Sequence, residues 1–448
     1  ISLTFFLIVA MQLPAQNAFL DKAIQKALAN NWVIKQKNVS LEKALAVIQQ
    51  AKANYLPNVA FQLGYQTGEG GRAIQIPVGD LMNPVYRTLN QLTSSNAFPT
   101  ISNVNQSFFP NNLYDAKISV TAPIYNENIK YNIQIQQQQR QLLSFEKELY
   151  ERELVKEIKQ AYFQYLSALQ LVSIYQSSLQ LATVAKNNYE KLLSSGKGLP
   201  VYVIRANSEI ASLEAKLNEA QLQAKNANLY FNFLSNEEAE TTINTQFNEQ
   251  EWLAGIQANL LQGIAVNGRE ELRMLQKAGE VQQTVVTMYK NFWKPQLNAF
   301  WSAGAQGERW KMNNRSWYYI GGLQLDIPIY SGKRNQLKIK QSNFDFQQTQ
   351  MQQQYVQSQL NLAASVAQNN LLSSIKNYKA ALQQTEAAAS YERLIQRGFA
   401  EGVNTYIETV DARNQFTIAQ LQLSLNLYKI FINHSILERE TAQYRLPK

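Results

Sequence analysis

The segment Gly398-Phe-Ala-Glu-Gly402-Val-Asn-Thr-Tyr-Ile-Glu-Thr-Val-Asp411-Ala412 interrupts a long part of the chain that otherwise lacks helix breakers. Residues 333–397, which precede it, contain neither glycine nor proline. After it, apolar residues recur at alternating intervals of three and four, which is typical of helices that pack as in a coiled coil. The segment therefore predicts a turn between two long helices. The apolar positions after the turn are Ile418, Leu421, Leu425, Tyr428 and Ile432.

A second turn of the same kind is predicted near Gly196. Residues 129–195, which precede it, also lack glycine and proline. Alanine follows the turn glycine after ten residues in both places, from Gly196 to Ala206 and from Gly402 to Ala412. We therefore expect two helical hairpins with their turns, or tips, at 194–200 and 398–404.

The two hairpins belong to an internal repeat. Ala-Pro-Ile-Tyr at 122–125 resembles Ile-Pro-Ile-Tyr at 327–330, and each opens one of the long helical stretches. The distance from the proline to the alanine beyond the tip is 83 residues in the first half and 84 in the second. This period is too long for a solenoid unit. It predicts two domain halves, 17–245 and 246–448, each with a helix, two strands and a long helical hairpin.

Short segments of alternating polarity precede the helical stretches. In 58–66 the odd positions are Val59, Phe61, Leu63 and Tyr65, and most even positions are polar. About ten residues with one apolar face is the length and pattern of an outer-membrane strand. An edge of a soluble sandwich is the alternative. We expect strands at about 57–66, 114–124, 295–305 and 317–329.

Aromatic residues crowd the ends of these strands, as they do where proteins cross the interfaces of a membrane. The aromatic residues we assign to the membrane interfaces are Tyr55, Tyr125, Trp293, Trp317 and Tyr330.

Composition narrows the possible functions of the 448-residue chain. It has no cysteine and one histidine, His434, so a metal site built from His and Cys is not expected. We expect no catalytic residues, no cofactor and no enzyme, because there is no Ser/His/Asp arrangement. The net charge of +9 is diffuse, so no nucleic-acid partner is expected. Residues 1–16 resemble the end of a secretory signal, and no later run of 18 apolar residues predicts a transmembrane helix.

Four strands cannot close a barrel, which takes about eight, and lipid does not tolerate open sheet edges. Two copies of the chain would make a barrel filled by side chains, whereas three copies would make twelve strands around a lumen. A helix over 129–193 would be about 100 Å long, far more than a bilayer, and must project from the membrane. The expected fold is α+β, with a shared twelve-stranded β-barrel on coiled-coil-like helices.

With its signal-like start, proline-opened strands, long helices and glycine-to-alanine tips, the sequence resembles the TolC-like outer-membrane efflux proteins over nearly its whole length. The most specific stretch is 398–412, which resembles the second periplasmic tip of the family. The resemblance implies a homotrimer in the outer membrane of a Gram-negative bacterium, with an α-helical tunnel in the periplasm. It implies a periplasmic adaptor, or membrane fusion protein, docked at the tips and an inner-membrane pump. The chain would be the export duct of a tripartite efflux or type I secretion system.

Two acidic residues beyond the second tip are candidates for the narrowest point of the tunnel. Glu408 and Asp411 are three residues apart, so they share one face of a helix. The resemblance places the acidic constriction of the family here, and three chains would gather six carboxylates around one axis. An ordinary solvated helix face is the alternative. The sequence departs from the family pattern at Phe399 and Asn404, which stand where the partners of closing hydrogen bonds can occur, so the resemblance does not imply a tightly bonded closed gate. The residues expected to dock the adaptor are Gly196, Lys197, Gly198, Gly398, Glu401 and Gly402.

The long segment 67–113 between the first two strands is predicted to be an extracellular loop, because it is rich in proline, asparagine and serine. It would be a tolerated insertion, a lid over the outer mouth, or a target of phages and antibodies. The main alternative for the whole chain is a coiled-coil scaffold of the cell envelope that transports nothing. Within the channels, the sequence does not separate drug, metal and protein export, nor does it identify the pump.

Overall fold

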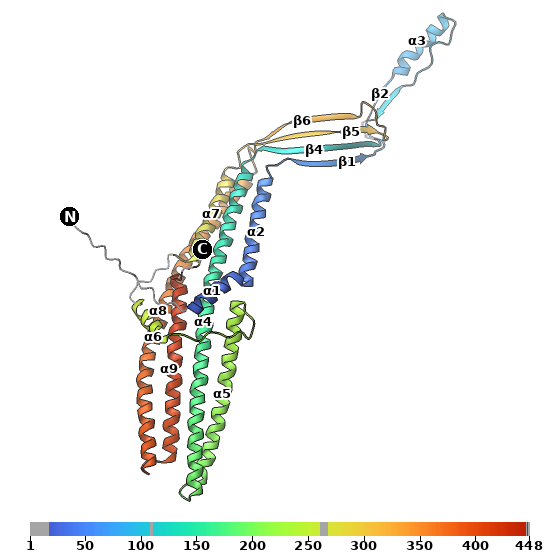
Figure 1. The fold of residues 1–448 in the computed structure, drawn as a ribbon. Coiled ribbons are helices and arrows are strands. Elements are labelled where there is room, and N and C mark those ends of the chain that lie inside the picture. Colours follow the sequence, from blue (N-terminus) through green and yellow to red (C-terminus); the bar gives the residue numbers. More distant parts are fainter. Residues whose placement is uncertain (1–17, 108–110, 260–267, 445, 447–448) are drawn as a thin grey trace, which may run out of the picture. The chain divides into compact units, whose positions relative to one another are not determined.

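The structure is a computed structural model that describes residues 18–107, 111–259, 268–444 and 446. The predicted signal segment, 1–16, lies outside the described residues. Figure 1 shows the chain as a ribbon with its elements labelled. The elements are α1 (Ala18–Asn30), α2 (Trp32–Ala53), β1 (Asn58–Gln66), β2 (Ala73–Ile76), α3 (Val78–Leu92), β3 (Val104–Ser107), β4 (Leu113–Tyr125), α4 (Glu127–Ser194), α5 (Pro200–Ser235), α6 (Glu249–Asn259), α7 (Glu270–Lys290), β5 (Gln296–Glu308), β6 (Trp317–Asp326), α8 (Arg334–Ala400) and α9 (Tyr406–Thr441).

Two long helical hairpins make up most of the described chain. In the first, α4 has 68 residues and α5 has 36; in the second, α8 has 67 and α9 has 36. The helices reach this length because neither α4 nor α8 contains proline, and the glycines stand at their C-terminal ends. In the described part of the chain, no helix combines the length and the apolar character needed to cross a membrane.

The strands β1, β4, β5 and β6 form one antiparallel sheet in the order β1-β4-β5-β6, and β1 and β6 are its edges (Figure 1). The first and third strands begin directly after Pro57 and Pro295. The fourth strand ends at Asp326, three residues earlier than the expected end at 329.

The register of the sheet collects most of its apolar side chains on one face. Val59 pairs with Val120, Val120 with Trp301, and Trp301 with Gly321. The neighbouring row pairs Phe61, Ile118, Ala303 and Tyr319 in the same way. The other face is mixed, because side chains alternate along a strand and this face carries Phe300 and Ile320 among mostly polar residues. Those polar residues include Gln62, Asp115, Lys117, Ser119, Ser302, Gln306 and Gln324.

The chain folds into two compact units. One comprises residues 1–45, 137–283 and 343–448, and the other comprises 46–136 and 284–342. The first unit contains the hydrophobic core, in which α1, α4, α5, α6, α8 and α9 meet. At its centre Phe163 packs against Phe247, Trp252 and Phe431, with ring centroids 5.2–5.5 Å apart.

Buried ion pairs fasten the C-terminal end of α9 inside this unit. Arg269, fully buried, bonds the Glu440 carboxylate and main-chain oxygen at 2.7 and 2.9 Å. Arg152 holds Glu270 through two bonds of 2.8 and 2.7 Å and also donates to the main-chain oxygen of Tyr444. Buried charges are tolerated when they are paired and hydrogen-bonded in this way.

The segment 67–113 is not the irregular loop that its composition suggested. It contains β2, α3 and β3, and the two strands pair through Ala73–Ile76 and Val104–Ser107. The start of α3 is capped by a residue distant in sequence, because Asn103 Oδ1 accepts hydrogen bonds from the N–H groups of Gly79 and Asp80 at 2.9 and 3.1 Å. This cap cannot be recognised from the local sequence, and the helix contains Pro84, a residue that usually interrupts helices.

Candidate functional site at the helix tips

Both tips have the same backbone construction. Gly196 follows α4 with φ +73°, and Gly402 follows α8 with φ +77°, in the left-handed region that glycine adopts without steric cost. In the first tip, Lys197 N donates to Leu192 O at 2.9 Å. In the second, Val403 N donates to Gly398 O at 2.8 Å. These are Schellman motifs, and the next helix begins four residues after the glycine in both tips.

The remaining predicted docking residues lie in or beside these turns. Lys197 and Gly198 stand between α4 and α5, and Glu401 is exposed between α8 and α9. A Cβ at Gly398 would lie 1.9 Å from Asn404 Oδ1. The Asn404 side chain therefore fills the space that a side chain at position 398 would need. The structure thus places all six predicted docking residues at the two tips.

Thr405 and Glu408 form a capping box at the start of α9. The Thr405 hydroxyl accepts the N–H of Glu408 at 3.4 Å, and Glu408 Oε2 accepts the N–H and hydroxyl of Thr405 at 2.6 and 3.0 Å. Asn404 Nδ2 donates to the same oxygen at 3.3 Å. The hydrogen bond from the Thr405 N–H, with those from the two side chains, lowers the pKa of Glu408. The signal was present in the sequence as Thr-x-x-Glu, but our prediction considered only the charge of Glu408.

Asp411 is exposed on α9, one turn after Glu408, and shares no hydrogen-bond partner with it. Its Oδ2 accepts from Gln415 Nε2 at 2.7 Å within the same helix. The two carboxylates therefore lie on one exposed face of α9 but have different partners. Glu408 caps the start of the helix, whereas Asp411 accepts a hydrogen bond from Gln415. That this face lines a duct remains a prediction.

A small core of aromatic residues joins the four helices just behind the tips. Tyr189 of α4 packs against Tyr406 of α9 with ring centroids 4.5 Å apart, and Tyr202 of α5 lies 4.7 Å from the same ring. Phe399, at the end of α8, lies 6.0 Å from Tyr189. The hydroxyl of Tyr406 is buried, and burial raises its pKa to about 12. Phe399 is thus a packing residue here.

An ion pair beneath this aromatic core links α9 to α5. Arg413 Nη1 lies 3.5 Å from Glu209 Oε1, and both side chains are buried, with exposed fractions of 4% and 8%. Burial raises the pKa of Glu209, and the neighbouring Arg413 and Arg205 oppose that rise. Our sequence reasoning missed this pair, because the partners are 204 residues apart and no spacing rule connects them.

The predicted membrane-interface aromatics lie at the ends of the sheet strands. Tyr55, Tyr125, Trp293 and Tyr330 stand near the ends that adjoin α2, α4, α7 and α8. Trp317 begins β6 at the opposite ends of the strands. All five side chains are exposed, with exposed fractions from 41% to 78%. Their positions are consistent with two belts, and their contact with lipid stays a prediction.

His434 of α9 is buried next to charged residues of its own helix and of other helices. Its Nδ1 lies 3.8 Å from Glu438 Oε2, and Lys159 of α4 donates to the same oxygen at 2.7 Å. The Trp252 ring of α6 packs edge-on against the imidazole, and Asp21 of α1 interacts electrostatically with Glu438 and Lys159. Burial lowers the pKa of His434, and the nearby Glu438 only partly opposes this effect.

We expect the thermal stability of the protein to fall as the pH drops below about 6.5, partly because of His434. The unfolded chain takes up a proton on this residue near pH 6.5. In the folded chain the pKa of His434 is lower, so the imidazole stays neutral to a lower pH. The contribution of neutral His434 to stability is therefore complete above its pKa in the unfolded chain. It is lost as the pH falls through its pKa in the folded chain. The midpoint temperature of helix loss, measured from pH 7.5 to 5, is expected to fall with pH. The His434→Gln variant is expected to show a smaller fall over the same range. Identical curves for both proteins would contradict the prediction.

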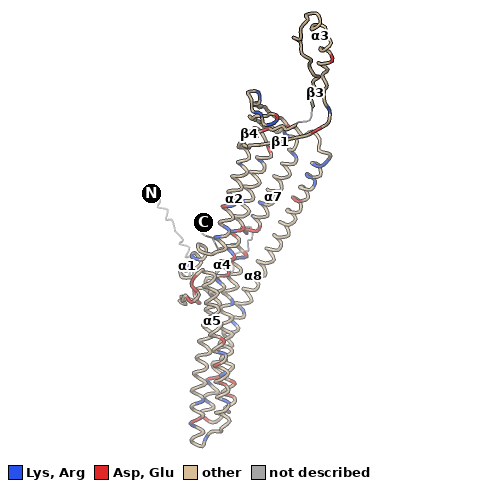
Figure 2. Tube along the Cα trace, turned by 90° about the vertical axis from the view of Figure 1, so that its right-hand side faces the viewer, with Lys and Arg blue, Asp and Glu red and all other residues tan. Residues whose placement is uncertain are grey.

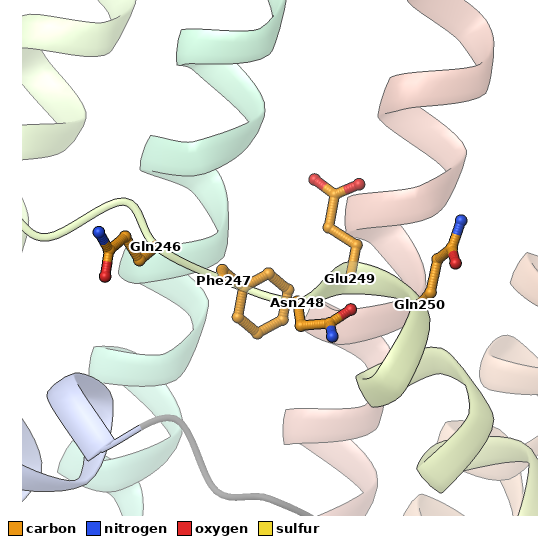
Figure 3. A pocket seen from close by; sticks show the side chains of 5 residues that line it. All are labelled: Gln246, Phe247, Asn248, Glu249 and Gln250. Atoms are coloured by element: carbon orange, nitrogen blue, oxygen red, sulfur yellow. The ribbon is translucent and has the colours of Figure 1, made fainter.

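An open hollow lies beside α6 in the described part of the chain. Figure 3 shows this hollow, lined by Gln246, Phe247, Asn248, Glu249 and Gln250. Its Phe247 belongs to the hydrophobic core, and Glu249 accepts a hydrogen bond from the Tyr428 hydroxyl. Within residues 18–107, 111–259 and 268–444, no three His, Asp or Glu side chains gather where they could hold a metal ion.

Comparison with known proteins agrees with this architecture. The model of the family "Outer membrane efflux protein" matches residues 23–235 and 263–439. The chain is also 24% identical to the outer membrane protein TolC of Escherichia coli strain K12 over 185 residues. That alignment covers 41% of this chain and 36% of TolC, so it spans about a third of the length of this relative.

Solved outer-membrane channels share the fold. The outer membrane protein VceC of Vibrio cholerae superposes with a TM-score of 0.71 at 13% identity, covering 94% of this chain and 95% of VceC. The outer membrane channel MtrE of Neisseria gonorrhoeae, solved in its open state, superposes with a TM-score of 0.71 at 14% identity, covering 94% and 88%.

Proposed function

Since this chain belongs to the outer membrane efflux protein family, a TolC-like family of transport ducts in the outer membrane, we propose that three copies form one export duct. The duct passes substrates outward from an inner-membrane pump, as in a tripartite efflux or type I secretion system. The observation that carries this proposal is the four-stranded sheet, which has one continuous apolar face and two open edges.

The apolar face is strongly exposed in the single chain. At the edge strands, Phe61 has an exposed fraction of 69%, Tyr319 of 81% and Leu323 of 66%. An exposed apolar band on antiparallel strands with a mostly polar reverse face suits a wall between lipid and water. Because lipid does not tolerate the open edges of β1 and β6, each edge must be covered by a neighbouring copy. Three copies make a twelve-stranded barrel that keeps a lumen, whereas two would make one that side chains fill.

The helical hairpins form the periplasmic tunnel in this proposal. α4 has 68 residues, which corresponds to about 100 Å and exceeds the thickness of any bilayer. The near-identical lengths of the paired helices and the shared Schellman motif at both tips support two structural repeats, 17–245 and 246–448. The tips are then the ends of the tunnel that face the inner membrane.

We expect the detergent-solubilised protein to sediment as a particle of three chains and to form ion-conducting pores in planar bilayers. The trimer follows from the open sheet edges, which neighbouring copies must cover. The conductance follows from the lumen of the twelve-stranded barrel that three copies form. Analytical ultracentrifugation with detergent matched in density will measure the mass. A monodisperse monomer would refute the shared barrel. A trimer that never conducts would favour the coiled-coil scaffold instead.

We expect a photo-reactive residue at Lys197 or Glu401 to capture a periplasmic adaptor protein in intact cells. The two positions lie at the two tips, and both tips expose apolar side chains near the turn, such as Leu199 at 55% and Val403 at 78%. A matched probe at Arg87 in α3, within the insert between β1 and β4, is the control. Capture of the adaptor from Arg87 alone would mean that the orientation proposed here is inverted.

A further inference from the structure

The helix α3 is held on one side by the chain segment that follows it. Asn83 exchanges two hydrogen bonds with the main chain of Ile101, at 2.9 and 2.8 Å. Two turns further along the helix, Asn90 exchanges two with the main chain of Phe98, at 2.8 and 3.0 Å. These contacts, with the Tyr86 ring 5.6 Å from that of Phe98, cover one side of the helix.

A regular apolar seam runs along α3, half-buried at Val78 and Leu89 and exposed at its other members. Its members follow one another at intervals of four, three, four and three residues, which is the a/d pattern of a coiled coil. Two of them are widely exposed, Val85 at 50% and Leu92 at 77%, and the adjacent Leu81 is exposed at 68%. The seam comprises Val78, Met82, Val85, Leu89 and Leu92.

The insert cannot bury this seam by itself. The ribbon that carries α3 has two strands joined by four residue pairs, and such a ribbon is marginal alone in water. A helix of 15 residues is also marginal without tertiary packing. The ribbon adds exposed apolar side chains of its own, Ile74 at 48%, Ile76 at 46% and Val104 at 48%. Burying a Val or Leu side chain is favourable, so this surface calls for a partner.

Charge indicates which partner fits. Figure 2 shows α3 almost wholly in the colour of uncharged residues. The helix carries one anion, Asp80, and one cation, Arg87, and neither is a member of the seam. Helices that lie on lipid surfaces are rich in Lys and Arg, which α3 is not. A seam without charge brings no like charges together when identical copies meet, and identical a/d seams are complementary to one another. The α3 helices of a second and a third copy of the chain can therefore bury this seam.

We propose that the α3 helices of neighbouring copies pack along this seam into a three-helix cap over the outer end of the duct. The inference rests on the trimer proposed above. Strand β1 leads into the insert and is also the sheet edge that a neighbour covers, so the insert starts at the proposed subunit boundary. It leaves the sheet at the strand ends opposite the long helices, since β1 follows α2 and β4 precedes α4.

Cysteine cross-linking tests the cap, and the chain has no cysteine of its own to interfere. Val85→Cys places a thiol in the seam, and Arg87→Cys is the matched control on the polar side of the same helix. In trimers isolated by sedimentation, oxidation is expected to link Val85→Cys into dimers of the chain, because two of three thiols pair. The control is expected to link at least tenfold more slowly. Equal rates for both variants, or linkage to a different protein, would overturn the cap.

Pore recordings separate failure of the cap from failure of the duct. Oxidised Val85→Cys trimers are expected to conduct less than reduced ones, and reductant is expected to restore the lost conductance. Conducting trimers that show no linkage through Val85→Cys would refute the cap and leave the duct intact. A monomer in sedimentation would refute the duct, and the cap with it.

Discussion

Replacing Asp411 by Asn is expected to lower the preference of the pore for cations and to weaken its block by multivalent cations. In the proposed trimer, three copies of this exposed carboxylate meet where the helices converge behind the tips. A ring of carboxylates favours cations, and its field is stronger in a narrow, partly water-free passage than in bulk solution. We expect the cation-to-anion permeability ratio to fall at least roughly threefold at low salt, where screening is weak.

The substitution can be made with little disturbance of the helix. Asn keeps an oxygen that accepts the hydrogen bond from Gln415, and the site is exposed. Adding Glu408→Gln removes the second charge and retains a side chain that completes a capping box. Glu408→Ala would instead remove the capping box, so a change in selectivity could also come from fraying at the start of α9. The matched control is Glu214→Gln on α5, further from the tip. If bilayer recordings show Asp411→Asn alone and with Glu408→Gln to be indistinguishable from the native pore, these carboxylates face solvent outside the tunnel.

Replacing Glu209 by Leu is expected to destabilise the tip region by about 3–5 kcal/mol, because it leaves Arg413 buried without its anion. An arginine cannot relieve this by releasing its proton at accessible pH. The opposite single change, Arg413→Met, is expected to cost less. Glu209 remains, but its raised pKa shows that burial already disfavours its charge, so it can take up a proton. The cost of Arg413→Met is therefore expected to shrink as the pH falls from 8 to 5.

Hydrogen exchange measured on peptides from 200–215 and 405–420 will report the local free energy of opening. A loss of about 3 kcal/mol corresponds to exchange that is faster by roughly a hundredfold. The double variant Glu209→Leu with Arg413→Met removes both charges and is expected to recover most of the protection, because well-packed apolar pairs replace buried ion pairs at little cost. If the double variant were as unstable as the sum of the single ones, packing rather than charge would explain the loss.

The sequence by itself determined the parts of this protein that depend on neighbouring residues. Long stretches without glycine or proline become α4 and α8, because nothing in them stops the helix. Gly196 and Gly402 end those helices, because glycine alone adopts the left-handed conformation freely. The alternation in 58–66 likewise determined a strand with one apolar face. The same local patterns located both tips and the residues placed there.

Only the tertiary structure decided the features that join distant segments. The apolar face of β5 and β6 is visible only from the register, which pairs Trp301 with Gly321 and sets glycine opposite a large ring. The pair of Arg413 and Glu209 depends on two helices that meet far from each other in sequence. The helix α3 is capped by Asn103, which no local pattern connects to it. Such contacts follow from the packing of whole elements, so they lie beyond what spacing along the chain can predict.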